Sequence, residues 1–578
     1  MSSNFTNLDW FVLLGYLLAT VSVGFYFHRS GSIEGFTAGN RSLPGWAIGL
    51  SMFGSYISSI SFLANPGTAY ASNWNAFVFS LATPIAAAIA VRWFVPFYRR
   101  IGAISAYEHL EQRFGAWART YAVVCFLLVQ MARMGTVVYL LALAMAPITG
   151  WKVQTTILLT GAVMTLYTVL GGIKAVVWTG VLQSAVLVAG TLICLVAIVQ
   201  NTTGGLSEII GAGIAEHKFS PGSFSLSLAE PTFWVVFVYG LTINLSNFAV
   251  DQSYVQRYIT ARSDTDAKKS VWLTAVLYVP VAAIFFFIGT GLYVFYGQRP
   301  DLLGSITKAD EVFPSFISTQ LSTGMAGVVV AAIFAASMDS NLNSMATLTY
   351  WDLYKRYIRP NASEYESLVV LRIATLAWGA ICTGVGLAMI QAESALDAWW
   401  QLAGIFSGGV LGLFLLGNLC RSATSAAGLA GVVTGVLVIA WMVFSPYWGR
   451  IDADAHVSDT SRRTIVVDPI AGRHLNLGEL VHLRYSWLDE KQSFRTADES
   501  RTITAISDSW GEIELDEPLK AKPTGSVAIF DDGVWYRWRS PFHNYLTVVV
   551  GTCVVLGTGF LIGGASQLIT GGGPNARI

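Results

Sequence analysis

Charged side chains are scarce in this sequence. Only 12% of its 578 residues are Asp, Glu, Lys or Arg, whereas 54% are hydrophobic. A soluble globular chain carries about a quarter charged residues, so this share excludes an ordinary water-soluble protein and indicates an integral membrane protein. The 35 acidic and 35 basic side chains cancel to a formal net charge of zero, which argues against a nucleic-acid partner.

Cysteine is also sparse, and the cysteines are not grouped. All five lie inside or at the ends of apolar runs, far apart in sequence: Cys125, Cys194, Cys382, Cys420 and Cys553. Their spacing therefore gives neither a disulfide framework nor a metal site. The first apolar run lacks a preceding basic region and a small-residue cleavage site, so it is predicted to be a retained helix rather than a signal peptide.

Long apolar runs dominate what is present. A membrane-crossing helix needs about 20 mostly apolar residues. The runs lie near 8–27, 44–70, 75–97, 118–148, 152–170, 175–200, 232–258, 271–296, 312–348, 366–390, 397–417, 425–445 and 542–566. They predict an all-α polytopic membrane protein with about 13 transmembrane helices. The lipid bilayer is thus the first expected partner.

Basic residues gather in alternate loops between these runs. Such clusters occur at Arg99 and Arg100, at Lys268 and Lys269, and again at 355–359, whereas loops such as 64–75 and 391–395 have almost none. Because basic loops stay on the cytoplasmic side, the alternation predicts an outer N-terminus and a cytoplasmic C-terminus in the inner cell membrane.

One polar stretch interrupts the apolar pattern. Between about 449 and 538, short runs rich in Val, Ile and Thr alternate with Gly, Asp and Pro, which predicts a small β-barrel or sandwich. The predicted orientation makes this insert extracytoplasmic. The chain then divides into a transmembrane transporter domain (1–448), the β-rich insert (449–538), and a final helix with a short cytoplasmic tail (539–578). We favour an accessory role for the insert over ligand capture.

Two predicted helices carry hydroxyl groups at mid-membrane. Ser58 and Ser61 are three residues apart in the second helix, as are Ser337 and Ser340 in the ninth, so each pair shares a helix face. Hydroxyls together with freed backbone carbonyls suit a monovalent cation such as sodium; the alternative is ordinary hydrogen bonding between helices. Asp339 is costly at this depth and favours a bound cation, a proton or a charged partner.

Two further ionisable residues lie within predicted spans. Arg133 could hold a carboxylate through a bidentate pair, or it could pair with an acid on a neighbouring helix. Asp251 either lines the inner exit of a pocket or pairs with Arg257. Polar residues upstream of it interrupt the apolar run, which is typical of a broken helix facing a cavity: Asn244, Ser246 and Asn247.

The second and seventh helices each open a run of five, at about 44–200 and 232–417. Hydropathy and the polar interruptions suggest an inverted five-helix repeat core. Such a repeat would place a binding site near the membrane midplane, on the first helix of each half.

Motifs along most of the chain resemble the sodium:solute symporter family, which includes sodium–glucose, proline and sialic acid symporters. They occur in order from residue 8 to about 445, and include Ser105-Ala-Tyr-Glu-His-Leu-Glu-Gln-Arg-Phe, Tyr167-Thr-Val-Leu-Gly-Gly-Ile-Lys, Val255-Gln-Arg-Tyr and Gly412-Leu-Phe-Leu-Leu-Gly. The resemblance implies an inverted-repeat core and sodium-coupled import of a small solute, with sodium as the co-transported ion. The insert has no counterpart in it.

The resemblance also implies a main sodium site. Its ligands would be the backbone carbonyls and one hydroxyl of Gly54, Ile57, Ile333 and Ser337. The neighbouring hydroxyl position of the family is Ala336 in this chain, so one ligand is missing.

A second sodium site of the sialic acid branch uses an aspartate at the position of Gly180. Our hypothesis is that Asp339, at a position where that branch has a serine ligand, supplies the carboxylate from the other helix. Asp339 and Ser340 would then keep a second cation site.

The sialic acid branch is also the nearest resemblance for the solute. Its substrate carboxylate is held at positions that match Ser58, Ser61 and Arg133, whereas the sugar-binding acid of the glucose branch falls at Ser80. We therefore predict a monocarboxylate, a sugar acid or sialic acid. The candidate solute-binding residues are Ser58, Ser61, Ser80, Arg133, Asn247, Asp251 and Gln252.

Other functions remain open at this stage. A neutral sugar could replace the carboxylate, and a proton carried by Asp339 could replace sodium. A transporter-like sensor is a third reading, although the inner tail is too short for a signalling domain. An enzyme is disfavoured, because the spans show no metal-ligand cluster, nucleophile elbow or phosphate loop.

Overall fold

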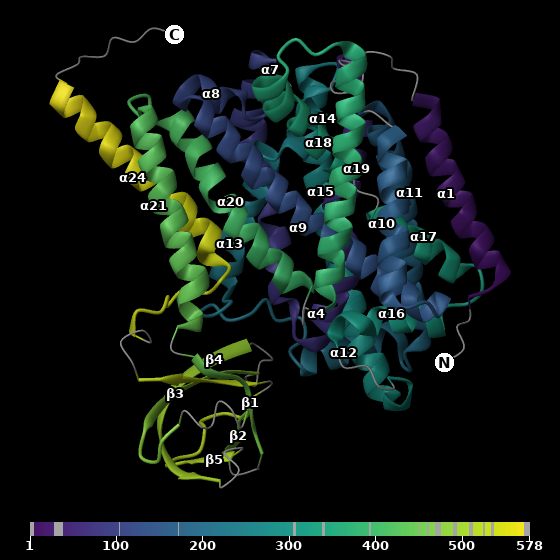
Figure 1. The fold of residues 1–578 in the computed structure, drawn as a ribbon. Coiled ribbons are helices and arrows are strands. Elements are labelled where there is room, and N and C mark those ends of the chain that lie inside the picture. Colours follow the sequence, from purple (N-terminus) through teal and green to yellow (C-terminus); the bar gives the residue numbers. More distant parts are fainter. Residues whose placement is uncertain are drawn as a thin grey trace.

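The computed structural model consists of a large helical body and a smaller β-barrel at one end of it (Figure 1). The structure describes residues 5–27, 39–102, 105–170, 173–303, 308–337, 341–391, 395–448, 450–458, 462–468, 475–488, 494–507, 512–523, 526–532 and 537–570.

The helical body begins with α1 (Asn7–Phe27). A broken helix follows, made of α3 (Gly45–Tyr56), η2 (Ile60–Ala64) and α4 (Asn65–Ala71). The next helix is segmented into η3 (Trp74–Phe77), α5 (Val78–Leu81), α6 (Thr83–Ile89), η4 (Ala90–Phe94) and α7 (Val95–Ile101). The next helices are α8 (Glu108–Phe114), α9 (Ala116–Thr149), α10 (Val153–Leu170), α11 (Ile173–Asn201) and α12 (Gly205–Ala215).

The remaining helices begin with the second broken helix. They are α13 (Phe233–Ala249), α14 (Gln252–Ile259), α15 (Asp264–Gln298), α16 (Ala309–Gln320), α17 (Met325–Ser337), α18 (Asn341–Leu348), η6 (Thr349–Ile358), α19 (Glu364–Ala388), α20 (Ala395–Leu419), α21 (Ser425–Phe444) and α24 (Leu546–Thr570).

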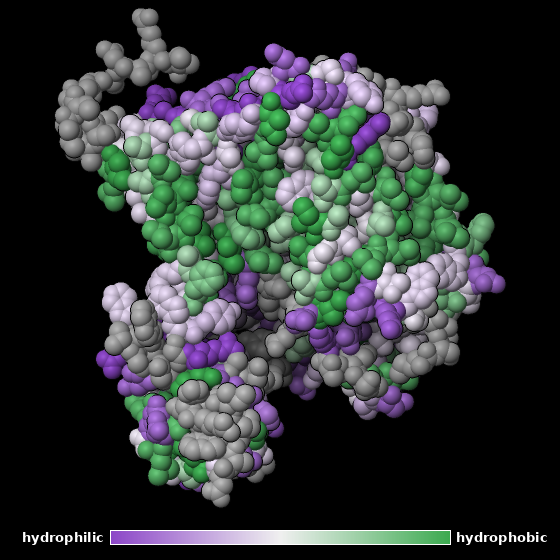
Figure 2. All heavy atoms as spheres, in the orientation of Figure 1, coloured by the Kyte–Doolittle hydropathy of each residue, from purple (hydrophilic) through white to green (hydrophobic). Residues whose placement is uncertain are grey.

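Hydropathy and helix length identify the membrane-crossing segments. Among the described residues, nine helices are long and apolar enough to cross a membrane, and up to eleven if each of two bent pairs is one span. Figure 2 shows a belt of hydrophobic side chains around the helical body, between two more hydrophilic ends. The predicted multi-pass membrane protein is confirmed, while the count of 13 stays a prediction.

The ninth predicted run has different bounds in the structure. Its first part, from 312 to 320, belongs to the separate short helix α16, and the candidate span is Met325–Ile358. The prediction joined them because the linking residues are too few to interrupt the hydropathy. Gly324, with a φ of +85°, ends the linking turn immediately before α17.

Both bent pairs occur where polar residues interrupt an apolar run. The helix from Gly45 to Tyr56 is bent by 56° against Ile60–Ala71, and Phe233–Ala249 by 46° against Gln252–Ile259. In the first pair Ile57 leaves the helical conformation, with φ −93° and ψ 88°. In the second, Asp251 restarts the helix, since its side chain accepts a hydrogen bond from the backbone N–H of Ser253 at 2.7 Å.

Asp9 fixes the start of α17, which carries two of the predicted sodium ligands. This side chain is fully buried, and its Oδ1 accepts hydrogen bonds from the backbone N–H groups of Gly324 at 2.8 Å and Gly327 at 2.7 Å. A carboxylate at a helix N-terminus satisfies amide groups that the helix itself leaves unpaired. Asp9 therefore joins α1 to α17.

We expect Asp9→Ala to lower the unfolding free energy by about 1–2 kcal/mol, the usual effect of losing such a cap. Asp9→Asn retains one carbonyl oxygen as an acceptor and should lose less. The thermal transition of the purified protein in detergent measures both variants. An Asp9→Ala protein as stable as the parent would contradict this role for the carboxylate.

The polar insert folds as a closed barrel of six strands, in the order β1-β2-β5-β4-β3-β6. The strands are β1 (Arg450–Val457), β2 (Thr464–Val466), β3 (Leu480–Leu488), β4 (Phe494–Ile506), β5 (Glu512–Leu515) and β6 (Val527–Asp531). Alternate residues of β3 point inward and are buried: Val481, Leu483 and Tyr485. Since β1 pairs with β6, the chain enters and leaves the barrel on neighbouring strands.

Candidate functional site

Two adjoining cavities lie within the helical body, beside the two bent helices. The first, here called the serine cavity, contains about 620 Å³ of space. Five of the predicted solute-binding residues line it: Ser58, Ser61, Ser80, Arg133 and Asn247. They come from the broken second helix, the segmented third, α9 and α13, so the fold brings together residues nearly 200 positions apart.

Aromatic rings complete the wall of the serine cavity. Tyr56, Tyr254, Tyr278, Trp399 and Trp400 all line it. The sequence did not single them out, since an aromatic residue in an apolar run has no mark that separates a cavity wall from a lipid-facing surface. Rings of this kind can cover the apolar faces of a solute while hydroxyl and guanidinium groups bind its polar atoms.

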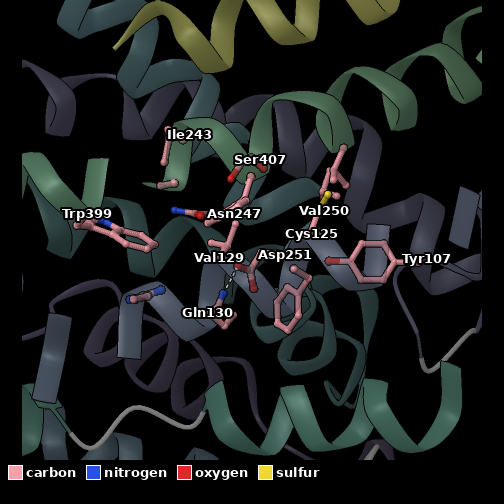
Figure 3. A pocket seen from close by; sticks show the side chains of 16 residues that line it. Tyr107, Cys125, Val129, Gln130, Ile243, Asn247, Val250, Asp251, Trp399 and Ser407 are labelled. Carbon is pink, nitrogen blue, oxygen red and sulfur yellow. Dashed lines mark hydrogen bonds between the residues drawn. The ribbon is translucent and has the colours of Figure 1, made fainter. Parts of the chain in front are cut away.

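The second cavity, here called the aspartate cavity, contains about 510 Å³ of space and is lined by Asp251 (Figure 3). Gln130 of α9 donates a hydrogen bond from Nε2 to Asp251 Oδ2 at 2.7 Å, as the dashed line shows. The other amide atom of Gln130, Oε1, accepts one from Asn341 Nδ2 at 2.6 Å. The break before α14 is thereby linked through α9 to α18.

Gln130 is a residue that the sequence reasoning missed, although a signal was present. It is a polar residue inside an apolar run and precedes Arg133 by three positions, so the two share one face of α9. Applying the helical spacing to the whole of that run would have found it.

Arg133 lies where the two cavities meet. Together with Asn247 it lines both, and its side chain is only 7% exposed. Its Nη2 donates a hydrogen bond to the carbonyl of Ser55, in the last turn of α3 where the helix break leaves carbonyls without intrahelical partners. The guanidinium therefore reaches the broken helix and both cavities.

A tyrosine connects the two broken helices. Tyr56 donates from its hydroxyl to Asn244 Oδ1 at 2.7 Å and accepts from Asn247 Nδ2 at 3.3 Å. Asn244 also donates to the carbonyl of Phe79 at 3.1 Å. The polar residues that interrupt the seventh helix thus orient it against the second and third helices, beside the serine cavity.

The remaining predicted solute residue, Gln252, lines neither cavity. Its Oε1 accepts a hydrogen bond from the backbone N–H of Ala106 at 2.7 Å, and the side chain is fully buried. This bond holds α14 against the segment before α8. Close to that segment, Glu111 accepts hydrogen bonds from Arg356 and from Arg119, the latter at 2.9 Å, and these bonds lower the pKa of the Glu111 carboxyl.

The four predicted ligands of the main sodium site lie on two helices that touch. Gly54 and Ile57 are at the broken end of α3, and Ile333 and Ser337 are near the end of α17. Ser337 is fully buried and donates from Oγ to the carbonyl of Ile333 at 2.7 Å. Hydroxyl and carbonyl oxygens are suitable ligands for a hard cation.

The second predicted cation site falls outside the described residues, because Asp339 and Ser340 belong to the segment 338–340. In the part of the chain that the structure describes, no group of three or more His, Cys, Asp or Glu is placed to hold a metal ion.

Helices α3 and α11 approach so closely that two glycines are required between them. A Cβ on Gly180 would lie 2.5 Å from Ser51 Oγ, and one on Gly54 would lie 2.7 Å from Ser184 Oγ. Ser184 donates to the carbonyls of Leu50 at 2.6 Å and Gly180 at 2.8 Å. At Gly180, where the resemblance implies an aspartate in the sialic acid branch, a side chain would therefore clash with Ser51.

We expect Gly180→Ala to destabilise the protein by about 1–3 kcal/mol, as overpacking in a well-packed interior does. Gly384→Ala is a matched control in α19, because a Cβ there would meet open space. Thermal transitions of the two variants provide the comparison. If Gly180→Ala and Gly384→Ala had equal thermal transitions, α3 and α11 could move apart without loss of stability, and the close packing described here would be contradicted.

Comparison with known proteins adds independent information. Residues 36–435 match the family model described as "Sodium:solute symporter family". The chain is 33% identical over 450 residues to the sodium/sialic acid symporter NanT of Aliivibrio fischeri, covering 76% of this chain and 88% of that protein. It is 29% identical to sodium-coupled monocarboxylate transporter 1 of Homo sapiens, covering 76% and 73%.

A solved structure is similar as well. The substrate-bound, outward-open state of a Na⁺-coupled sialic acid symporter has a TM-score of 0.72 to this chain at 29% identity. The match covers 76% of this chain and 93% of that one.

Proposed function

Because the chain belongs to the sodium:solute symporter family and is thus a sodium-coupled transporter rather than an enzyme, we propose that its solute is a small organic anion, such as a sugar acid or sialic acid. The observation that carries this proposal is the position of Arg133, which lines both cavities and shares the serine cavity with Ser58 and Ser61. The names of the relatives point to the same chemistry, since sialic acid and monocarboxylates both carry a carboxylate.

In this proposal the solute binds in the serine cavity. Arg133 forms a bidentate, charge-assisted pair with the carboxylate, and the serine hydroxyls donate to its remaining lone pairs. Tyr56 and Trp400 cover the rest of the molecule. Ser80 and Asn247 offer polar groups to its hydroxyls, and Asp251 lines the adjoining aspartate cavity.

Sodium would bind between α3 and α17. Its proposed ligands are the carbonyls of Gly54, Ile57 and Ile333 and the hydroxyl of Ser337. An ion at this point connects the broken helix, whose other face lines the serine cavity, to α17. Each sodium moved inward across about 100 mV gains roughly 2.3 kcal/mol from the potential, which can drive the solute uphill.

A second cation site at Asp339 and Ser340 is part of the proposal. We expect Asp339→Asn to weaken sodium affinity or reduce the Hill slope of sodium activation, because an amide lacks the negative charge that attracts the ion. Uptake of the labelled acid over a range of sodium concentrations measures both quantities. Unchanged sodium dependence would contradict the second cation site, and acid-driven uptake without sodium would favour a proton at Asp339.

For alternating access we propose that the serine cavity opens outward and the aspartate cavity inward. Tyr545, which follows the barrel in sequence, lies with its ring 4.8 Å from that of Trp400, so the serine cavity faces the barrel side. On this assignment the N-terminus and the barrel are extracytoplasmic and the C-terminus is cytoplasmic, in the inner membrane. Sodium and solute stabilise each other's binding, and the bundle then exposes them to the inner side.

The finer architecture is proposed on the same basis. The two bent helices each open a repeat, over about 44–200 and 232–417, and the short apolar helices α1 and α10 bring the number of spans to about 13. The chain divides into a transporter domain (1–448), an accessory barrel (449–538) and a final helix with its tail (539–578).

Thermal stability of the purified protein tests the solute class. Organic acids and neutral sugars are compared, each in sodium and in potassium, because a ligand of the folded state raises the transition by mass action. A carboxylate that stabilises only in sodium supports the proposal. Stabilisation by neutral sugars alone would favour the neutral-sugar alternative.

A further inference from the structure

A groove that shares no lining residue with the two cavities lies between η4 and α7 on one side and α15 on the other. It contains about 1390 Å³ of space. Helix α7 ends at the end of the helical body opposite the barrel (Figure 1), so the groove lies near that end. Three cationic side chains line it: Arg92, Arg100 and Lys268.

The spacing of these cations directs them to one place. Arg92 and Arg100 are eight residues apart in neighbouring helical segments, so both lie on the same face of the third span. Lys268 is in the second turn of α15, on the opposite wall. All three residues are exposed, and within the described ranges none of them makes an ion pair.

The acidic residues at the start of α15 are engaged by other cations. Asp264 accepts from Arg99 Nε at 2.8 Å, and Asp266 accepts from Arg262 Nε at 2.7 Å. Neither Asp264 nor Asp266 lines the groove. The three cationic side chains therefore line the groove together, and no carboxylate lines it with them.

The same groove has an apolar wall with two exposed tryptophans. Trp93 is 60% exposed, Trp272 is 40% exposed, and Phe97 lies between Trp93 and Ile101 on one helix face. Exposed tryptophans on a membrane protein occupy the headgroup level of the bilayer, with one edge in hydrocarbon and the other near water. A cation near this level is favourable when it reaches a lipid phosphate.

We propose that this groove binds an anionic phospholipid. Arg92, Arg100 and Lys268 hold the phosphate and the negative headgroup, arginine by paired N–H groups and lysine as a point charge. The acyl chains lie along Trp93, Phe97 and Trp272. A soluble anion would satisfy the cations but would leave this apolar wall uncovered, which is why a lipid is the occupant.

The test uses the full-length protein, delipidated in detergent and then supplied with phosphatidylglycerol or phosphatidylcholine. Native mass spectrometry counts bound lipid, and the thermal transition measures stabilisation. We expect phosphatidylglycerol to bind and stabilise. Substitution to Gln at positions 92, 100 and 268 together should weaken its binding about a hundredfold, given the contribution of each cation at a membrane surface.

A second triple variant, Lys174→Gln, Lys269→Gln and Arg421→Gln, removes the same charge at positions that do not line the groove, and should bind phosphatidylglycerol like the parent. Three results would overturn the proposal. These are equal binding by the groove variant, equal loss in the control variant, and equal stabilisation by inorganic phosphate or glycerol phosphate alone. A groove variant whose transition in phosphatidylcholine matches the parent's shows that it is folded.

Discussion

Replacing Arg133 with alanine is expected to weaken binding of the carboxylate solute by a hundredfold or more. The guanidinium is almost fully buried at the meeting point of the serine and aspartate cavities. Charge-assisted hydrogen bonds to a buried carboxylate contribute about 1.5–3 kcal/mol each, and a bidentate pair has two. Binding is measured by the solute-dependent shift of the thermal transition in sodium, and transport by uptake of the labelled acid.

The same residue also supports the helix break, since it donates to the carbonyl of Ser55. Some loss of stability without solute is therefore expected, and the sodium-dependent shift in the absence of solute shows whether the site survives. Arg133→Lys keeps the charge but loses the paired N–H geometry, so it should give an intermediate affinity. If Arg133→Ala binds the acid as the parent does, the guanidinium is structural and the solute class is wrong.

Replacing Ser337 with alanine is expected to reduce sodium affinity by tenfold or more and to uncouple solute binding from sodium. Ser337 is fully buried at the end of α17, and it is the only side-chain ligand in the proposed main site. Because Ala336 stands where the resemblance implies a further hydroxyl ligand, the proposed site has no second side-chain hydroxyl to replace the lost one. Sodium titration of the thermal transition gives the affinity directly.

Two further variants make this prediction sharp. Ser270→Ala removes an equally buried hydroxyl that donates to a backbone carbonyl, Ala267 O at 2.8 Å, on α15, and should leave the sodium response unchanged. Ala336→Ser restores the missing hydroxyl and should strengthen sodium binding. A normal sodium response in Ser337→Ala would mean that the ion binds elsewhere.

The sequence predicted features that depend on local patterns. Apolar runs of membrane length predicted the helices, and short runs rich in Val, Ile and Thr, separated by Gly, Asp and Pro, predicted the strands of the insert. Polar interruptions such as Asn247 predicted the break in the seventh helix, because backbone groups without partners in a membrane must face polar groups or a cavity. The resemblance then placed Arg133 and Ser61 in one site, and the structure brings them to the same cavity.

Features that depend on long-range packing were not predicted. Tyr56 and Trp400 are ordinary aromatic residues until the fold brings them against one cavity. The link from Gln130 to Asp251 joins α9 to a helix 121 residues away, which no local pattern encodes. The close approach of α3 and α11 at Gly180 likewise depends on how the two helices pack. The sequence alone showed only that Gly180 stands where the resemblance implies an aspartate.

The barrel has a consequence for how the protein is made. Helix α24 packs along both α20 and α21, yet the whole barrel separates it from them in the chain. On the proposed orientation, this segment must pass through the translocation channel before α24 leaves the ribosome. One face of α20 and α21 would therefore remain uncovered until the barrel has crossed the membrane. Packing of α24 against these two helices, the last step of assembly, then depends on secretion of the barrel.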